Sequence, residues 1–535
     1  MPSHFPWLTV ITFAPLAGAV LVVVAPARAH NLHRLLALVT GLATFGLSLG
    51  MLSAYDGGVG GFQLIDRATW VRSLNFQYLL GVDGISLFMV LLTAFLMPAA
   101  VLVSWRIERQ VKYYMAAFLV IETAMIGTFL ALDLLLLFIF FEALLFPMYL
   151  IIGGWGSERR VYAAVKFFLF TMAGSAFLLV AILFLYFRAG SQLGTPTFDI
   201  TQIQGVALSA STARWLFLGF FVAFAVKVPL FPLHTWLPDA HTEAPTAGSV
   251  VLAAVLLKVG AYGLIRFNLS LFPEASTYFR TLVSVLALIG IVYGAVVALI
   301  QTDVKRLVAY SSVSHLGFVV LGTFAFTVEG LSGSVLQMVN HGLSTGALFL
   351  LVGMLYDRTH TRDLSKMGGL AVPMPVLAGV FLFVALSSAG LPGLNGFVGE
   401  FLILLGTFAV TKAYAVIAVT AVVLAAIYLL WSYQRMMHGP LLVEEHGRLP
   451  DLNRREYAIL APILAAILFI GIYPKPFLSM IEPTVTQSAR CVGVVNVPGS
   501  SINPRGPGPP RPLPVFPGTV VCGARHQVSA AEASP

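Results

Sequence analysis

The stretch LLLLFIFFEALLFPMYL (134–150) decides the class of fold, because it is apolar throughout except for one carboxylate, Glu142. As a helix it would cross most of a hydrocarbon layer about 30 Å thick. Similar stretches recur along the 535 residues, of which 58% are hydrophobic and 10% charged. A soluble domain is usually about 25% charged. The sequence therefore predicts an all-α, polytopic membrane protein.

Hydropathy predicts about fourteen transmembrane helices. The expected spans are 5–25, 32–54, 79–104, 113–131, 134–153, 162–187, 213–230, 246–267, 277–300, 306–327, 331–356, 373–410 (interrupted), 414–437 and 456–480. Grouped into larger units, we expect helices one to three in 1–110, a first five-helix repeat in 111–268, a second in 269–437, the last transmembrane helix in 438–485 and a Pro/Gly-rich disordered tail in 486–535.

Basic residues predict the orientation of these helices. Lys and Arg are more than twice as numerous in the odd-numbered loops as in the even-numbered ones. Because basic loops remain in the cytoplasm, both termini are expected on the outer side of a bacterial inner membrane. The net charge of +8 is spread over these short loops, so it does not indicate nucleic-acid binding.

The chain offers no recognisable ligands for a redox cofactor. Its two cysteines, Cys491 and Cys522, follow the last span and are too few for an iron–sulfur cluster or a cysteine-rich zinc site. No strand–GxGxxG–helix pattern for a nicotinamide is visible. Any redox chemistry that drives this protein is therefore expected in partner proteins.

Two segments rich in Pro and Gly indicate an internal repeat. FAVKVPLFPLHTWLP (224–238) in helix seven corresponds to SSAGLPGLNGFVGEF (387–401) in helix twelve. Proline and glycine interrupt both helices in mid-membrane, where freed backbone groups must line a wet cavity or be buried against protein. Because five helices per repeat is an odd number, the two copies would enter from opposite sides, as in many transporters. Matching breaks favour an ion path over simple kinks.

Several ionisable side chains stand where a membrane helix would ordinarily use leucine. Each costs at least about 2.5–3.5 kcal/mol at the centre of a membrane, and function is the usual reason for keeping one. An opposite charge near a buried lysine stabilises its ionised form, so a Glu142–Lys227 pair that opens and closes could gate proton release. The candidates are Glu122, Glu142, Lys227, Lys258, His315, His341 and Glu400. A structural polar contact is an alternative explanation for Glu122 and His315.

Five motifs resemble those of the antiporter-like subunits of respiratory complex I, over roughly residues 70–480. They are GVDGIS (81–86), FFEALLFPMYLIIGGWG (140–156), KVPLFPLHTWLPDAHTEAPTAGSVVLAAVLLKVGAYGL (227–264), TDVKRLVAYSSVSHLG (302–317) and LPGLNGFVGEF (391–401). The resemblance implies fourteen helices, two inverted five-helix repeats and a hydrated axis between half-channels. Glu400 stands where other antiporter-like chains usually have lysine.

The resemblance also implies a role for each candidate. Glu142 and Lys227 would form a regulatory pair, Lys258 and His341 the connection, His315 an auxiliary on the axis, and Glu400 the carrier toward the outside, while His234 and His241 would lie in the loop after helix seven near proton uptake. The chain itself would hold no cofactor, since NADH, FMN, iron–sulfur clusters and quinone would belong to partner subunits. Its partners would be other membrane subunits, including other antiporter-like chains, and the lipid bilayer.

The expected function is proton translocation by a membrane subunit of an NADH–quinone oxidoreductase, driven by quinone reduction elsewhere in the complex. Two alternatives remain open. A subunit of a multisubunit sodium/proton antiporter would be expected to carry lysine at position 400 and to transport sodium. A passive scaffold would leave the buried lysines and glutamates without a purpose.

Overall fold

The computed structural model describes residues 5–492, and this part of the chain is all-α apart from one hairpin and three isolated β-bridges. Thirteen of its helices are long and apolar enough to cross a membrane, which confirms the predicted polytopic fold. The interrupted span expected at 373–410 is occupied by two shorter apolar helices. The expected disordered tail lies mostly outside the described residues, since the last helix ends at Cys491.

Most of the predicted spans correspond to one or two helices of the structure. The elements are α1 (Trp7–Val24), α2 (His30–Ala54), β1 (Gln63–Val71), η1 (Arg72–Leu74), β2 (Phe76–Val82), α3 (Ser86–Val103), η2 (Ser104–Arg106), α4 (Val111–Leu130), α5 (Leu134–Ala143), α6 (Leu145–Trp155), α7 (Arg160–Leu193), α8 (Ile200–Ile203), α9 (Ala210–Lys227), α10 (Trp236–Glu243), α11 (Thr246–Val251), η3 (Leu252–Leu256), α12 (Leu257–Gly263), η4 (Leu264–Asn268), α13 (Leu269–Leu271), α14 (Pro273–Leu299), α15 (Val304–Ala325), α16 (Val328–Thr359), η5 (Leu364–Lys366), α17 (Pro375–Ser388), α18 (Asn395–Val410), α19 (Lys412–Met437), η6 (Glu444–Arg448), α20 (Arg454–Ile472) and α21 (Lys475–Cys491).

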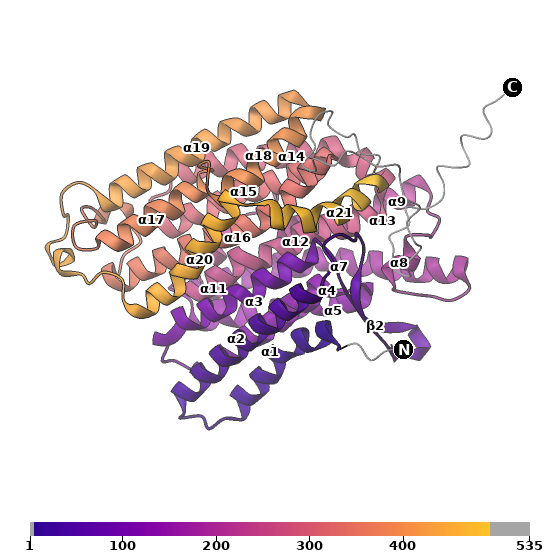
Figure 1. The fold of residues 1–535 in the computed structure, drawn as a ribbon, viewed down its shortest axis with the longest axis horizontal. Coiled ribbons are helices and arrows are strands. Elements are labelled where there is room, and N and C mark those ends of the chain that lie inside the picture. The colour runs from indigo at the N-terminus through magenta and orange to yellow at the C-terminus, as the bar shows by residue number, and fades with distance from the viewer. Residues whose placement is uncertain (1–4, 493–535) are drawn as a thin grey trace.

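The helices form an elongated bundle, and different parts of the chain form its two long edges. Figure 1 shows α1 and α2 at one edge and α19 at the opposite edge, with α20 and α21 running across the face between them. α16 lies inside the bundle and packs against α15 and α18. Every residue in the most apolar window of α16 is buried, so its polar side chains face protein rather than lipid.

The hairpin β1–β2 was not predicted from hydropathy. Its strands pair antiparallel with Asp66 opposite Leu80, and the reversal uses Asn75 in the left-handed region at φ +47°. Asparagine tolerates this conformation better than most residues. The hairpin is fixed to α1, because Asp66 accepts hydrogen bonds from the backbone and hydroxyl of Thr9.

Helical structure stops inside two of the expected spans. α9 ends at Lys227 and α10 begins at Trp236, and the irregular segment between them contains Pro229 and Pro232. α17 ends at Ser388 and α18 begins at Asn395. Gly390 and Gly393 between these two helices have φ angles of +77° and +90°, which glycine adopts without steric cost.

Two helices far apart in the chain, α5 and α15, begin in the same way: an aspartate caps the helix and pairs with a second aspartate. Asp133 caps α5 and forms an isolated β-bridge with Asp199. Asp303 caps α15 and forms the same kind of bridge with Asp363. Each capping carboxylate accepts two backbone N–H groups of the first turn, which would otherwise be unpaired.

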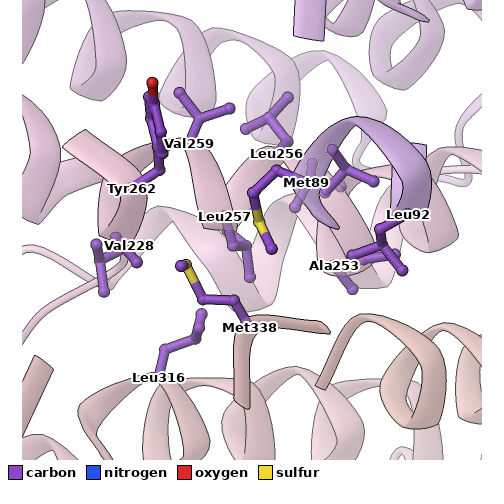
Figure 2. Packing of buried hydrophobic residues seen from close by; sticks show 14 of the residues in the cluster. Met89, Leu92, Val228, Ala253, Leu256, Leu257, Val259, Tyr262, Leu316 and Met338 are labelled. Atoms are coloured by element: carbon purple, nitrogen blue, oxygen red, sulfur yellow. The ribbon is translucent and has the colours of Figure 1, made fainter. Parts of the chain in front are cut away.

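The core is densest around the buried segment Thr246–Leu271. Figure 2 shows Leu256, Leu257 and Val259 of this segment packed with Met89 of α3 and Met338 of α16. Two turns of the segment, η3 and η4, are wider π-helical turns. Wider turns of this kind release backbone carbonyls and are frequent at functional sites. η3 immediately precedes the turn that carries Lys258.

Candidate proton path

Lys258 and His341 form one buried contact at the centre of the bundle. The Nζ atom of Lys258 lies 2.6 Å from Nδ1 of His341, and both side chains are almost wholly buried. Nζ also donates to the carbonyl of Ala253, which belongs to η3. When Lys258 is protonated it has only donors, in which case Nδ1 accepts and the imidazole proton is on Nε2. Within residues 5–492, that Nε2 has no hydrogen-bond partner.

His315 and Glu400 form a second buried contact, between α15 and α18. Nδ1 of His315 lies 2.8 Å from Oε1 of Glu400, and the same oxygen accepts from Gln337 Nε2 at 3.1 Å. On its other side, Nε2 of His315 lies 3.4 Å from the hydroxyl of Tyr428. The carboxylate of Glu400 therefore has two side chains beside one oxygen, the ring of His315 and the amide of Gln337.

A small polar cavity lies beside both contacts. Its volume is about 10 Å³, and its lining includes His315 and His341, whose ring centres are 5.8 Å apart. This volume is close to the space that one water molecule needs. Asn340 and Ser388 also line it, and the side-chain oxygens Oδ1 of Asn340 and Oγ of Ser388 are buried without partners in the described chain. The cavity thus joins groups that lack hydrogen-bond partners.

Sequence reasoning missed several polar residues of this region. Asn395, the first residue of α18, accepts on Oδ1 from the hydroxyls of Ser344 and Ser387. Asn340 donates to the backbone carbonyl of Asn395. A signal was present, because Gln337, Asn340 and Ser344 recur at helical spacing with His341 on α16. None of these residues titrates, so a search for ionisable groups passes over them.

Lys227 is separate from these contacts. It is the last residue of α9, wholly buried, and its Nζ has no hydrogen-bond partner among the described residues. The ammonium lies over the rings of Phe141 and Phe167, 4.9 and 5.6 Å from their centres. Glu142 is the carboxylate whose charge acts on it, although the two are not within ion-pairing distance. Glu142 itself is partly exposed on the surface of α5.

Apolar side chains surround the segments that carry the two lysines. Val228, next to Lys227, and Leu257, next to Lys258, belong to one buried cluster with Leu316 and Met338. Figure 2 shows Met338 between Leu316 and Leu257. The structure therefore brings Lys258, His341, His315 and Glu400 together but does not connect Lys227 to them through polar groups.

Of the remaining candidates, only His241 differs from its expected position. His241 was expected in a loop, and this was wrong: it lies in α10, is fully buried, and its ring stacks on Phe349 with centres 4.7 Å apart. Its neighbours include Lys258 and Lys305, whose charges act on it. His234 lies in the irregular segment before α10, next to Phe231. Glu122 is buried in α4, and neither of its oxygens has a partner in the described chain.

Comparisons with known proteins identify the family of this chain. The family described as NADH:quinone oxidoreductase/Mrp antiporter, transmembrane, matches residues 131–425. NADH-quinone oxidoreductase subunit M of Rhodobacter capsulatus is 47% identical over 492 residues, covering 90% of this chain and 96% of that protein. NADH-ubiquinone oxidoreductase chain 4 of Arabidopsis thaliana is 42% identical over 482 residues, covering 90% of this chain and 96% of that protein.

A solved structure gives the same result. A chain of respiratory complex I from Thermus thermophilus superimposes with a TM-score of 0.83 at 33% identity, covering 91% of this chain and all of that one. The chain therefore belongs to the family of antiporter-like, proton-translocating membrane subunits of NADH-quinone oxidoreductase that comprises subunit M and chain 4.

Proposed function

We propose that protons cross this subunit along Lys227, Lys258, His341, His315 and Glu400. The observation that carries the proposal is the buried polar chain from Lys258 to Glu400, interrupted only at a cavity whose lining residues include unpaired groups. A water there would have Nε2 of His341 and Oδ1 of Asn340 as possible partners, as buried waters require. The proton would pass from His341 to His315 through this water and then to Glu400.

In this proposal, the first half of the path is closed in the arrangement described above. Lys227 is surrounded by aromatic rings, and Leu257, Leu316 and Met338 form an apolar barrier near Lys258. Proton transfer from Lys227 then requires transient hydration of this barrier. Hydrophobic constrictions in channels gate by wetting and drying in this way. His241 and Lys305 would accept protons near the uptake side.

Glu142 is the residue through which neighbouring subunits would act. Its side chain is partly exposed on α5, within a membrane-spanning segment, and its Oε1 is buried without a hydrogen-bond partner in the described chain, which is costly for an ionised carboxylate. A neighbouring membrane subunit that covers this face would change the distance between Glu142 and Lys227. That distance determines how strongly the ammonium is stabilised. NADH oxidation and quinone reduction, with FMN and iron–sulfur clusters, would occur in partner subunits.

The orientation and the repeat belong to the same proposal. The two aspartate bridges, Asp133–Asp199 and Asp303–Asp363, support two five-helix units of related structure. Inserted from opposite sides, these units would open the Lys227 half to one side of the membrane and the Glu400 half to the other. We place both termini on the outer side of a bacterial inner membrane, so that Glu400 delivers protons outward.

The test is Lys258→Met in the assembled complex, reconstituted into proteoliposomes. Methionine keeps most of the side-chain volume but removes the charge, so the fold should survive. We expect proton translocation per NADH oxidised to fall by at least about tenfold, since a positioned proton-transfer group is lost. Lys412→Met is the matched control, because Lys412 is exposed at the start of α19. Unchanged pumping by the Lys258→Met complex would favour a scaffold role and refute the path.

A further inference from the structure

The turn between α1 and α2 forms an open hollow of about 730 Å³ at the end of the bundle that carries these two helices. Its lining includes Arg28, His30, Asn31 and Arg34, with Glu108 as the acidic member. Arg28 and His30 are exposed. Among the described residues, neither arginine has a carboxylate within ion-pairing distance. The hollow therefore carries two arginines against one glutamate, so its lining has a net positive charge.

Arg34 is held in a defined orientation at this hollow. Its Nη1 donates to Asn31 Oδ1 and its Nη2 to the carbonyl of Ile107, both at 2.8 Å. The first bond lies within α2, and the second joins α2 to the loop before α4. A guanidinium carries five N–H donors in a rigid fork, so further donors remain for a ligand. A fork fixed in this way suits the oxygens of a phosphate group.

Apolar side chains begin where the basic hollow ends. Leu32 lines the hollow, and Leu35, Val39 and Leu42 follow it on one exposed face of α2. On α1, Val20, Leu21 and Val24 are exposed near the same turn, and Val24 is 77% exposed. Both helices are at the edge of the bundle (Figure 1), and most of their residues are not buried.

We propose that this hollow binds the headgroup of an anionic phospholipid, whose acyl chains lie along the exposed faces of α1 and α2. The charge of the lining selects the ligand, because a basic cluster next to a membrane helix attracts anionic headgroups. The exposed apolar residues that continue from Leu32 provide a surface along which the acyl chains can pack away from water. The site lies away from the proton path and does not depend on the proposed function.

The experiment uses the whole complex in a bilayer that contains a phosphatidylglycerol analogue with a photoactivatable acyl chain. The same label on phosphatidylcholine is compared in parallel, and adducts are mapped by mass spectrometry. We expect peptides of α1 and α2 to be labelled by the phosphatidylglycerol analogue in preference. In the Arg28→Gln/Arg34→Gln variant this labelling should fall by roughly 30-fold, the effect of removing two basic residues at a membrane surface.

Two further variants separate binding from local misfolding. Arg28→Gln alone removes an exposed side chain with no hydrogen bond to the loop, and should lower labelling by about fivefold. Arg72→Gln/Arg188→Gln removes two exposed arginines elsewhere and should leave it unchanged. Equal labelling by both lipids, or unchanged labelling in the Arg28 variants, overturns the proposal. So does cross-linking of this turn to an acidic segment of another subunit in place of lipid.

Discussion

Nδ1 of His315 lies 2.8 Å from Oε1 of Glu400, and this contact joins α15 to α18 with both side chains about 5% exposed. Gln337 donates to the same oxygen, so the carboxylate is oriented by two side chains from different helices. A proton that reaches His315 therefore has an acceptor already in place. The arrangement makes Glu400 the natural end of the buried chain.

Glu400→Gln should separate the role of Glu400 as a proton carrier from its role as a hydrogen-bond acceptor. The amide oxygen can still accept from His315 and Gln337, but the side chain can no longer take up a proton. We expect assembly and thermal stability close to those of the wild-type complex, with proton translocation per NADH reduced by at least about tenfold. Proteoliposome measurements would show this. Glu274→Gln, at an exposed glutamate in the first turn of α14, is the control. Normal pumping in the Glu400→Gln complex would show that Glu400 only fixes the helices.

Gly390→Ala should disturb the same carboxylate through the backbone. Gly390 has φ +77°, and an added Cβ would lie 2.9 Å from Oε2 of Glu400. The left-handed conformation alone costs an alanine about 1–2 kcal/mol. We expect a lower thermal midpoint and weaker pumping. Gly393→Ala is matched to it, because Gly393 has φ +90° and an added Cβ meets nothing within 4 Å there. Equal behaviour of the two variants would contradict the proposed contact.

Hydropathy was sufficient for most of the transmembrane helices because each is long and predominantly apolar. The irregular segment after α9 contains Pro229 and Pro232, which lack the N–H that a helix needs. The hairpin β1–β2 was missed because β2 overlaps the start of the helix expected at 79–104, and because the strands alternate too little in burial to show a clear period of two.

Pairings between side chains could not be read from the chain. His315 and Glu400 are 85 residues apart, and nothing in either local sequence indicates their contact. The sequence also suggested a Glu142–Lys227 pair that opens and closes; in the structure Lys227 lies against aromatic rings, and the two residues are not within ion-pairing distance. Such distances depend on helix packing and on neighbouring subunits, which local patterns do not encode.

Arg358→Ala should destabilise the join between α16 and α20. Arg358 donates from Nη1 and Nη2 to the two oxygens of Glu456, at 2.9 and 2.6 Å, and both side chains are less than 10% exposed. Removing one partner of a buried pair leaves the other charge uncompensated, at a cost of about 3–5 kcal/mol. We expect a lower thermal midpoint of the complex in a thermal-shift assay.

The double variant Arg358→Met/Glu456→Leu provides the comparison for that prediction. It removes both charges and keeps apolar volume, so it should recover most of the lost stability. If the double variant is as unstable as Arg358→Ala alone, then the bonds from Arg358 to the carbonyls of Pro450 and Asp451 and the capping box of α20, rather than the ion pair, hold these helices together.

Asp133→Asn should change how stability depends on pH. Asp133 lies between α4 and α5, and burial, together with the nearby charge of Asp199, raises its pKa to about 6 despite three backbone N–H donors. In the unfolded chain the pKa is about 3.9. The folded state therefore binds the proton more tightly, and this contribution to stability is full below about pH 4 and lost as the pH rises through about 6.

The difference between the folded and unfolded pKa of Asp133 corresponds to about 3 kcal/mol of stability at most. Asparagine keeps the acceptor for the N–H groups of Leu135 and Leu136 but has no proton to lose. We therefore compare the thermal midpoints of the two complexes at pH 5 and pH 7. The midpoint of the Asp133→Asn complex relative to that of the wild type should be higher at pH 7 than at pH 5. Asp363→Asn is the control, since that partly exposed carboxylate is held by Ser365 and its pKa is lowered. Parallel pH profiles for wild-type and Asp133→Asn complexes would mean that Asp133 remains ionised through this range.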